Sequence, residues 1–181
     1  DVLTSLSGND EFALELNTTT SFYQHALGGA TPSDINGAML DVVPELAFDS
    51  YVTVGLTQAP ELGEEAADLM PGSWEDAFEA GSSISVNDGL GSGWYTLPFA
   101  DNGTAGASGR ILVAQLTTDG DISGQFRAQI FPGGDQVNDV RADLSFVHAR
   151  TCSELTIDVV QVTTSGDATG NYTITRTFTA T

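Results

Sequence analysis

The stretch that most constrains the fold of this chain runs from residue 110 to residue 131 and reads RILVAQLTTDGDISGQFRAQIF. Residues 111–117 form a largely apolar run that favours a β-strand. Asp119-Gly120 follows, and this dipeptide is typical of a type I′ hairpin turn. The next segment alternates, with Ile122, Phe126, Ala128 and Ile130 on one face and polar residues on the other. The pattern predicts a β-hairpin at the centre of an all-β domain.

Further short segments with strand-like patterns are separated by turns rich in glycine, asparagine and aspartate. We predict strands at 12–17, 46–57, 83–86, 94–97, 140–147, 155–163 and 172–181, with 18–23 as a further extended segment. Gly55 inside the strand at 46–57 indicates a bulge or the close approach of another backbone. Amphipathic helices are nearly absent from the pattern, and 181 residues suit one domain. The sequence therefore predicts a single antiparallel β-sandwich or jelly-roll of about eight to ten strands over residues 1–181.

The longest interruption of the strand pattern is an acidic insertion at residues 58–81. Residues 64–70 can form a short helix that Pro71-Gly72 would end. Trp74 and Phe78 have two interpretations. They pin the insertion onto the sandwich, which we expect, or they form an aromatic binding platform.

The charge balance excludes some partners. The chain has 25 acidic residues against five basic ones, and its formal net charge is -20. Such a surface repels phosphate backbones and anionic lipids, so we expect neither nucleic-acid binding nor membrane insertion. The excess of carboxylates serves either as a solvated face suited to salt-rich water or as a set of cation ligands.

Calcium is the cation that the acidic turns would suit, because it prefers clustered oxygen donors on flexible backbone. The candidate metal ligands are Asp119, Asp121, Asp135, Asn138, Asp139 and Asp143, with Asn87-Asp88 as a further pair. The alternative interpretation is turn chemistry, because Asp and Asn side chains hydrogen-bond to their own backbone. No EF-hand loop is present, and we expect no cofactor to be required.

Catalytic patterns are weak, and we predict that the protein is not an enzyme. The chain has two histidines, His25 and His148, and one cysteine, Cys152, which supply neither a paired zinc site nor a convincing nucleophile-base pair. No serine stands in a G-x-S-x-G elbow. Carboxylate pairs of the glycosidase type stay open, because the sequence ranks no pair above another.

Several features favour a secreted or cell-surface protein. Asn17, Asn102 and Asn171 each begin an N-x-Ser/Thr glycosylation signal. No apolar run approaches the length of a membrane span, and we expect a chain that opens on Asp1 to be a mature protein without its leader. Cys152 has no intrachain partner, which leaves a buried thiol or an intermolecular disulfide.

Five motifs in a fixed order carry a family resemblance. They are Phe22-Tyr-Gln-His-Ala-Leu-Gly-Gly29, Leu46-Ala-Phe-Asp-Ser-Tyr-Val-Thr-Val-Gly55, residues 74–81, Trp94-Tyr95, and residues 109–117 with the following Gly-x-Ile-Ser-Gly124. In these motifs the chain resembles secreted modules of marine bacteria, planctomycetes especially, and of some marine microalgae. The resemblance covers about two-thirds of the chain and implies an exported surface or matrix protein, not a reaction.

Two functions follow as expectations. The first is a non-enzymatic extracellular structural protein, a subunit of a surface layer, filament or matrix, that self-associates through its terminal strands and Cys152. The alternative is a calcium- or carbohydrate-binding secreted module whose acidic loops supply the ligands.

Overall fold

A computed structural model describes residues 1–72 and 74–149. The chain divides into two units, residues 1–149 and 150–181, and every described residue belongs to the first unit. The strands predicted at 155–163 and 172–181, Cys152 and Asn171 therefore lie outside the described residues. That residues 1–181 form one domain stays a prediction.

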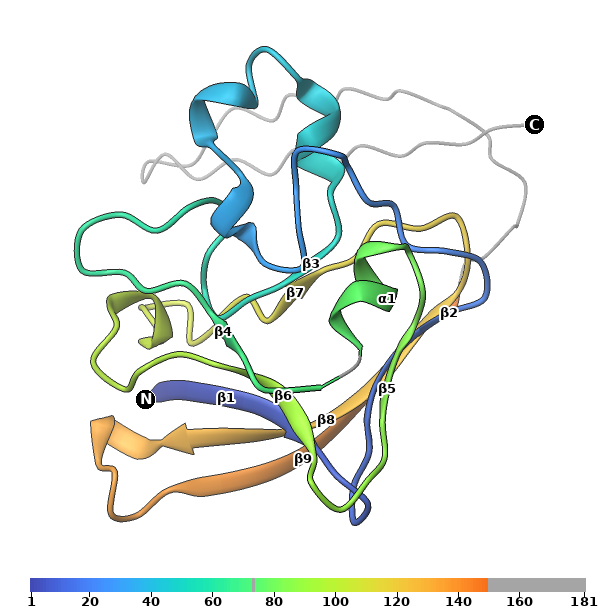
Figure 1. Ribbon diagram of the computed structural model, residues 1–181. Coiled ribbons are helices and arrows are strands. Elements are labelled where there is room, and N and C mark those ends of the chain that lie inside the picture. Colours follow the sequence, from blue (N-terminus) through green and yellow to red (C-terminus); the bar gives the residue numbers. More distant parts are fainter. Residues whose placement is uncertain (73, 150–181) are drawn as a thin grey trace, which may run out of the picture. The chain divides into compact units, whose positions relative to one another are not determined.

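Antiparallel sheets dominate the described residues, which confirms the all-β class (Figure 1). One sheet has seven strands in the order β4-β6-β1-β8-β2-β5, with β9 paired to β8, and a second sheet pairs β3 with β7. The strands are β1 (Val2–Gly8), β2 (Leu14–Thr18), β3 (Tyr51–Val52), β4 (Asp68–Leu69), β5 (Ile84–Val86), β6 (Ser92–Tyr95), β7 (Ala114–Gln115), β8 (Ile122–Phe131) and β9 (Val140–His148). The helical elements are α1 (Glu75–Glu79) and the 3₁₀ turns η1 (Pro32–Asp34), η2 (Gly37–Met39), η3 (Pro44–Phe48), η4 (Asp101–Gly103) and η5 (Pro132–Gly134).

Strand β8 is the central strand of the large sheet and pairs with β1, β2 and β9. It pairs with β9 along most of its length, from Ile122 opposite His148 to Ile130 opposite Val140. Its other edge is shared by β1, which pairs with the C-terminal half, and by β2, which pairs with the N-terminal half. Strands β6 and β5 continue this arrangement beyond β1 and β2. Figure 1 shows the sheet turning upward from β1 and β6 toward β2 and β5.

The core lies between the large sheet and the segments that cover it, and the two-residue alternation of β8 decides which side chains enter it. Phe126 and Ala128 are buried as the sequence predicts, and Leu6, Leu14 and Leu16 of β1 and β2 join them. Val52 and Val54 belong to the same cluster from the covering layer. Trp94 is fully buried, and its indole N–H donates to the Thr53 carbonyl at 3.0 Å. The large aromatic ring is thus buried with its polar atom satisfied.

The central hairpin prediction is wrong, although a strand does lie on each side of Asp119-Gly120. Strand β7 pairs with β3, whereas β8 belongs to the large sheet, so the turn joins two sheets. The segment that follows β2 explains this. Thr19 exchanges two bonds with Asp121: its N–H donates to the Asp121 carbonyl at 3.1 Å, and its Oγ1 accepts from the Asp121 N–H at 2.9 Å. Thr19, which directly follows β2, thereby occupies the backbone N–H and C=O of Asp121 that a hairpin between β7 and β8 would use.

The predicted strand at 46–57 is mostly replaced by other structure. Pro44, whose fixed φ suits the first position of a helix, begins the turn η3, and β3 covers only Tyr51–Val52. Gly55 confirms the close backbone approach: its φ is 81°, and a Cβ there would meet the Asn102 carbonyl oxygen.

Trp74 and Phe78 pin the acidic segment to the core, as expected. Both side chains are buried, and the indole N–H of Trp74 donates to Ser92 Oγ at 2.9 Å. Phe78 meets Phe22 edge to face at 5.7 Å between ring centroids. The short helix predicted at 64–70 is wrong: residues 68–69 form β4 against β6, and the helix begins five residues after the expected end, at Glu75.

Candidate functional site

The connection between β8 and β9 holds three of the predicted calcium ligands, and each already has protein partners. Asp135 accepts from the Val137 N–H at 2.9 Å and from Asn138 Nδ2 at 2.7 Å. Asp139 accepts from Gln129 Nε2 at 2.9 Å and from Arg141 Nε at 3.2 Å. These hydrogen bonds lower the pKa of both carboxyls, chiefly through Asn138 for Asp135 and Gln129 for Asp139. The turn-chemistry interpretation describes Asp135, which bonds to the Val137 backbone, whereas Asp139 bonds to the side chains of Gln129 and Arg141.

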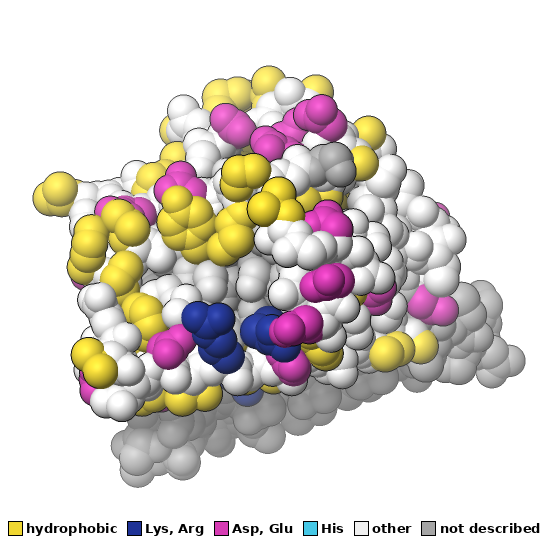
Figure 2. Space-filling view, turned by 60° about the horizontal axis from the view of Figure 1, so that its bottom comes forward, with side chains coloured by type: hydrophobic (Ala, Val, Ile, Leu, Met, Phe, Trp, Pro, Cys, Tyr) yellow, Lys and Arg dark blue, Asp and Glu magenta, His cyan; other side chains and the backbone are white. Residues whose placement is uncertain are grey.

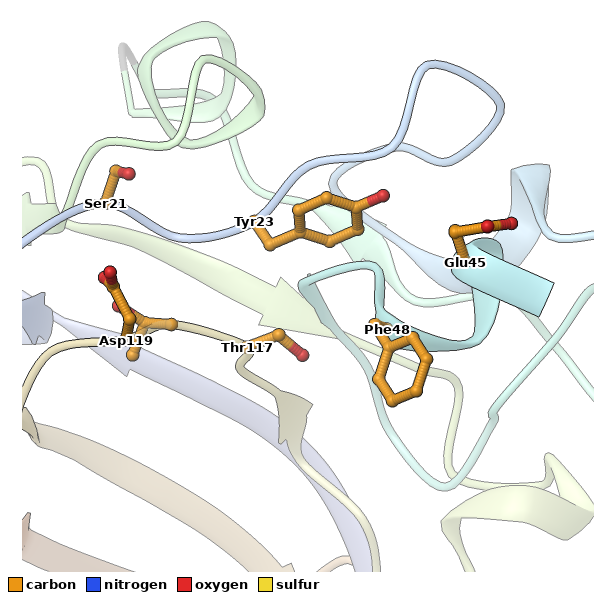
Figure 3. Close-up of a pocket in the computed structure, with 7 residues that line it drawn as sticks. Ser21, Tyr23, Glu45, Phe48, Thr117 and Asp119 are labelled. Atoms are coloured by element: carbon orange, nitrogen blue, oxygen red, sulfur yellow. The ribbon is translucent and has the colours of Figure 1, made fainter. Parts of the chain in front are cut away.

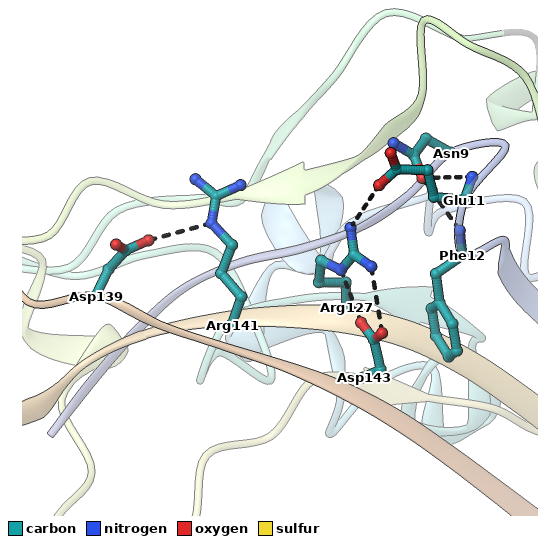
Figure 4. Close-up of polar contacts among 7 residues, drawn as sticks. All are labelled: Asn9, Glu11, Phe12, Arg127, Asp139, Arg141 and Asp143. Carbon is teal, nitrogen blue, oxygen red and sulfur yellow. Dashed lines mark hydrogen bonds and ion pairs between the residues drawn. The ribbon is translucent and has the colours of Figure 1, made fainter.

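Asp143 lies farther along β9, directly opposite Arg127 of β8. Arg127 binds it with two bonds, Nε to Oδ1 at 2.7 Å and Nη2 to Oδ2 at 3.2 Å, and a third contact reaches Glu11 Oε2 at 3.7 Å (Figure 4). The hydrogen bond from Arg127 is the main cause that lowers the pKa of Asp143. Figure 2 shows arginine side chains gathered with acidic ones on one face of the molecule.

Asp119 and Asp121 precede the other end of β8, so the fold does not bring them to the 135–139 turn. The Asp119 carboxylate accepts from Thr20 Oγ1 at 2.8 Å. Within residues 1–72 and 74–149, no three His, Cys, Asp or Glu side chains come together as a group that could hold a metal ion. The structure therefore separates the proposed ligands into different places, and calcium binding stays a prediction.

The predicted glycosylation positions have different environments. Asn17 lies on β2 opposite Ser123 of β8. Asn102 lies in η4, and its Nδ2, the atom that would carry a sugar, donates to the Val54 carbonyl at 2.6 Å and to the Glu65 carbonyl at 3.0 Å. Its Oδ1 accepts from the Glu65 N–H at 3.0 Å. Glycosylation stays a prediction, with Asn102 in an evident structural role.

One candidate surface is the outer edge of β9. Among the described residues this strand pairs only with β8, so its second edge has no partner strand there. Leu144 is 45% exposed although it lies opposite the buried Phe126, and Val140 and Phe146 on the same face are also exposed. An apolar stripe thus continues the core face of the sheet out to its edge.

The second candidate surface is an open groove of about 570 Å³ beside the 117–119 segment that leads into β8 (Figure 3). It is lined by Ser21, Tyr23, Glu45, Phe48, Thr117, Thr118 and Asp119. In Figure 3 the ring of Tyr23 lies between the 45–48 and 117–119 segments. The groove therefore combines two aromatic rings, two carboxylates and four hydroxyl groups, one of which is the phenol of Tyr23.

The sequence does not predict this groove, because its residues come from three segments that lie far apart in the chain. The predicted extended segment at 18–23 and the predicted strand at 46–57 give no indication that Tyr23 and Phe48 line the same groove. Asp119 is the one lining residue that is also a candidate site residue from the sequence, as a calcium ligand. No local motif joins the three segments, since the bonds between them form only in the folded chain.

The chain gives no match to protein-family models, to curated proteins or to solved structures. The resemblance to secreted marine modules therefore stays a prediction. Over the described residues, no helix is long and apolar enough to cross a membrane.

Proposed function

We propose that this protein is a non-enzymatic structural subunit of an extracellular surface layer, filament or matrix, a β-sandwich whose copies associate through the outer edge of β9. The observation that carries the proposal is the length and composition of that edge. Strand β9 has nine residues, whereas β4 and β5, which end the order of the large sheet, have two and three. Proteins usually keep an edge strand short, charged or covered, because its free N–H and C=O groups are a template for another chain. A long edge with exposed apolar side chains suits association.

The charges on β9 favour one way of pairing two copies. A two-fold antiparallel pair centred on Ala142 places Arg141 of each copy opposite Asp143 of the other. The same register places Val140 opposite Leu144, so apolar residues also meet. A pair centred on Asp143 would oppose two carboxylates, which is unfavourable. The Ala142 register is therefore the one that we propose.

The net charge of -20 sets the conditions for this association. Two copies repel each other at low ionic strength, and salt removes most of the repulsion because the screening length falls from about 8 Å at physiological ionic strength to about 3 Å at 1 M. We expect association to strengthen as salt rises. This behaviour is consistent with an acidic protein of a salt-rich extracellular environment.

Sedimentation velocity of the full chain, over a range of protein and NaCl concentrations, tests the proposal. We expect wild type to form dimers or larger species in high salt and Leu144→Lys to stay a monomer, because the variant buries an unpaired cation between apolar edges. Val137→Lys is the matched control: Val137 is 88% exposed and precedes β9, so this variant should associate like wild type. Thermal melting establishes that both variants fold.

A strictly monomeric wild type at every salt and protein concentration, with and without reductant, would contradict the proposal. Equal association of wild type and Leu144→Lys would contradict the β9 interface. A two-fold edge pair closes at the dimer, so a layer or filament needs a second contact between dimers. Electron microscopy of native material would reveal it.

A further inference from the structure

We propose that the groove between the 21–23, 45–48 and 117–119 segments binds a neutral hexose unit of a polysaccharide. This site shares no residue with the β9 edge, and so it goes beyond the structural function proposed above. Three features of the groove support it: a fixed backbone, two exposed aromatic rings and a surrounding set of hydrogen-bonding side chains.

The backbone of the groove is fixed before any ligand arrives. The Tyr23 N–H donates to the Thr117 carbonyl at 2.7 Å, and the Ser50 N–H donates to the Tyr23 carbonyl at 3.0 Å. Ser50 Oγ accepts from the Thr117 N–H at 2.9 Å. These bonds join the three segments although almost a hundred residues separate Tyr23 from Thr117. Small-molecule sites are usually formed in advance in this way, since ordering loops on binding costs affinity.

The two aromatic rings of the groove are exposed, whereas Trp74, Phe78 and Trp94 are buried in the core. Tyr23 is 39% exposed and Phe48 is 59% exposed. Tyr23 is also flanked by the His25 ring, at 6.5 Å between centroids, which restricts its position. The face of an aromatic ring carries partial negative charge, and the C–H groups on one face of a pyranose are weakly positive. Two such rings in one groove suit the apolar face of a sugar.

The polar side chains suit the hydroxyl edge of the same sugar. The carboxylates of Glu45 and Asp119 are acceptors for sugar O–H groups, and the Ser21 and Thr117 hydroxyls can both donate and accept. The Asp119 carboxylate is oriented by the bond from Thr20 Oγ1 at 2.8 Å. An anionic polysaccharide or a nucleotide would be repelled by two carboxylates on a protein of net charge -20, and a wholly apolar ligand would make no use of the hydroxyl and carboxylate groups of the groove. A neutral saccharide satisfies both halves of the groove.

Native affinity electrophoresis of the full chain tests this inference, with galactomannan, xyloglucan and mixed-linkage β-glucan as neutral probes and alginate as the anionic one. We expect at least one neutral polymer to retard wild type and alginate to have no effect. Phe48→Ala and Tyr23→Ala should each weaken the retardation by about tenfold. Phe99→Ala is the matched control, because Phe99 is 72% exposed and does not line the groove. This variant should bind like wild type.

Two further measurements distinguish sugar binding in the groove from cation binding and from association through β9. Glu45→Gln keeps an acceptor oxygen, so it should retain most of the neutral-sugar binding, whereas complete loss would show that binding depends on the charge of the carboxylate, as cation-mediated binding would, and would overturn the proposal. Absence of retardation by all three neutral polymers, or equal retardation of wild type and Phe48→Ala, would also overturn it. Leu144→Lys, which tests the β9 interface, should bind the polysaccharide like wild type, so the failure of either proposal is distinguishable from failure of the other.

Discussion

The buried carboxylate of Asp49 accepts a hydrogen bond from the backbone N–H of His25 at 2.7 Å. Its second oxygen accepts from the Gly29 N–H at 3.2 Å. One side chain thereby fixes the 25–29 loop against the end of η3, next to the groove. These two segments belong to the first two motifs of the family resemblance, and Asp49 joins them together with the Ser50 N–H, which donates to the Tyr23 carbonyl.

Replacing Asp49 should destabilise the protein. Asp49→Ala leaves two backbone donors without their acceptor, and we expect a loss of about 2–4 kcal/mol in the free energy of unfolding. Asp49→Asn keeps the shape and one acceptor, so it should lose less. Urea denaturation of the two variants and wild type measures both effects. Equal stability of Asp49→Ala and wild type would show that the loop does not depend on this carboxylate.

The same residue gives a prediction for pH. Burial raises the pKa of Asp49 above its ordinary value of 3.8, and this outweighs the lowering by the hydrogen bonds from His25 and Gly29. Between 3.8 and the raised pKa, the folded protein binds a proton that the unfolded chain does not, so this residue's contribution to stability falls as pH rises. The melting temperature of wild type relative to Asp49→Asn should therefore increase on acidification from about pH 7 toward about pH 4. A constant difference, or a smaller one in acid, would contradict the assignment.

Arg127 and Asp143 should have the opposite pH dependence. The bond from Arg127 lowers the pKa of Asp143, so the stability from this pair is present above pH 3.8 and is lost as pH falls through the lowered pKa. Arg127→Gln should lower the melting temperature modestly near neutral pH, because both side chains are partly exposed. The difference from wild type should disappear in strong acid and shrink in high salt. A difference independent of both pH and salt would point to packing of the arginine stem instead.

How far the sequence predicts this fold depends on how local the signal is. The inward face of β8 is correct because alternation of Phe126 and Ala128 with polar residues is a property of that segment alone. The sequence does not predict strand β1, because its buried positions include Thr4 and Gly8, small residues that carry no hydrophobic pattern. The hairpin prediction from Asp119-Gly120 is wrong because the residues that bond to this turn, Thr18–Thr20, lie about a hundred residues away in the sequence. Local patterns identify strands, and non-local hydrogen bonds decide their partners.

In the candidate sites too, local contacts can be predicted from the sequence, whereas contacts between distant segments cannot. The sequence places Asp135 in a turn correctly, and its contacts with Val137 and Asn138 are local ones that the residue types favour. The pairing of Asp143 with Arg127 requires the register of β8 and β9, which no local pattern determines. The groove requires the bond between Tyr23 and Thr117, two segments with no shared motif.

Replacing Gly124 tests how Phe146 of β9 packs against β8. It lies opposite Phe146, whose ring would be 2.5 Å from a Cβ added there, and the Glu15 carbonyl oxygen would be 2.8 Å away. Gly124→Ala must displace the ring and strain the β2–β8 pair, so we expect a loss of about 1–3 kcal/mol. Urea denaturation measures it. The double variant with Phe146→Ala should lose less than the sum of the single changes, since the clash with the ring is removed. Full additivity would contradict the contact between Phe146 and the glycine.

Asn102 is the residue whose replacement should loosen the acidic segment. Its amide joins the Val54 carbonyl to both backbone groups of Glu65, so it fixes the 61–65 turn to the core through three hydrogen bonds. Asn102→Ala should cost about 2–3 kcal/mol, because the partly buried backbone groups lose their partners. Asn102→Asp keeps the acceptor for the Glu65 N–H and loses both donors. Hydrogen exchange should therefore become faster at the Glu65 amide in Asn102→Ala and stay close to wild type there in Asn102→Asp.

Thr104→Ala is the control for the Asn102 variants, because it abolishes the glycosylation signal without touching this amide. In a bacterial host it should leave hydrogen exchange at Glu65 unchanged. Unchanged exchange in Asn102→Ala would instead mean that the segment is held by its other contacts, such as the Asp101 N–H that donates to the Gly63 carbonyl at 3.0 Å. The N-x-Thr signal at Asn102 would then be free to act as a glycosylation site, since attaching a sugar to Nδ2 would no longer cost the fold a hydrogen bond on which it depends.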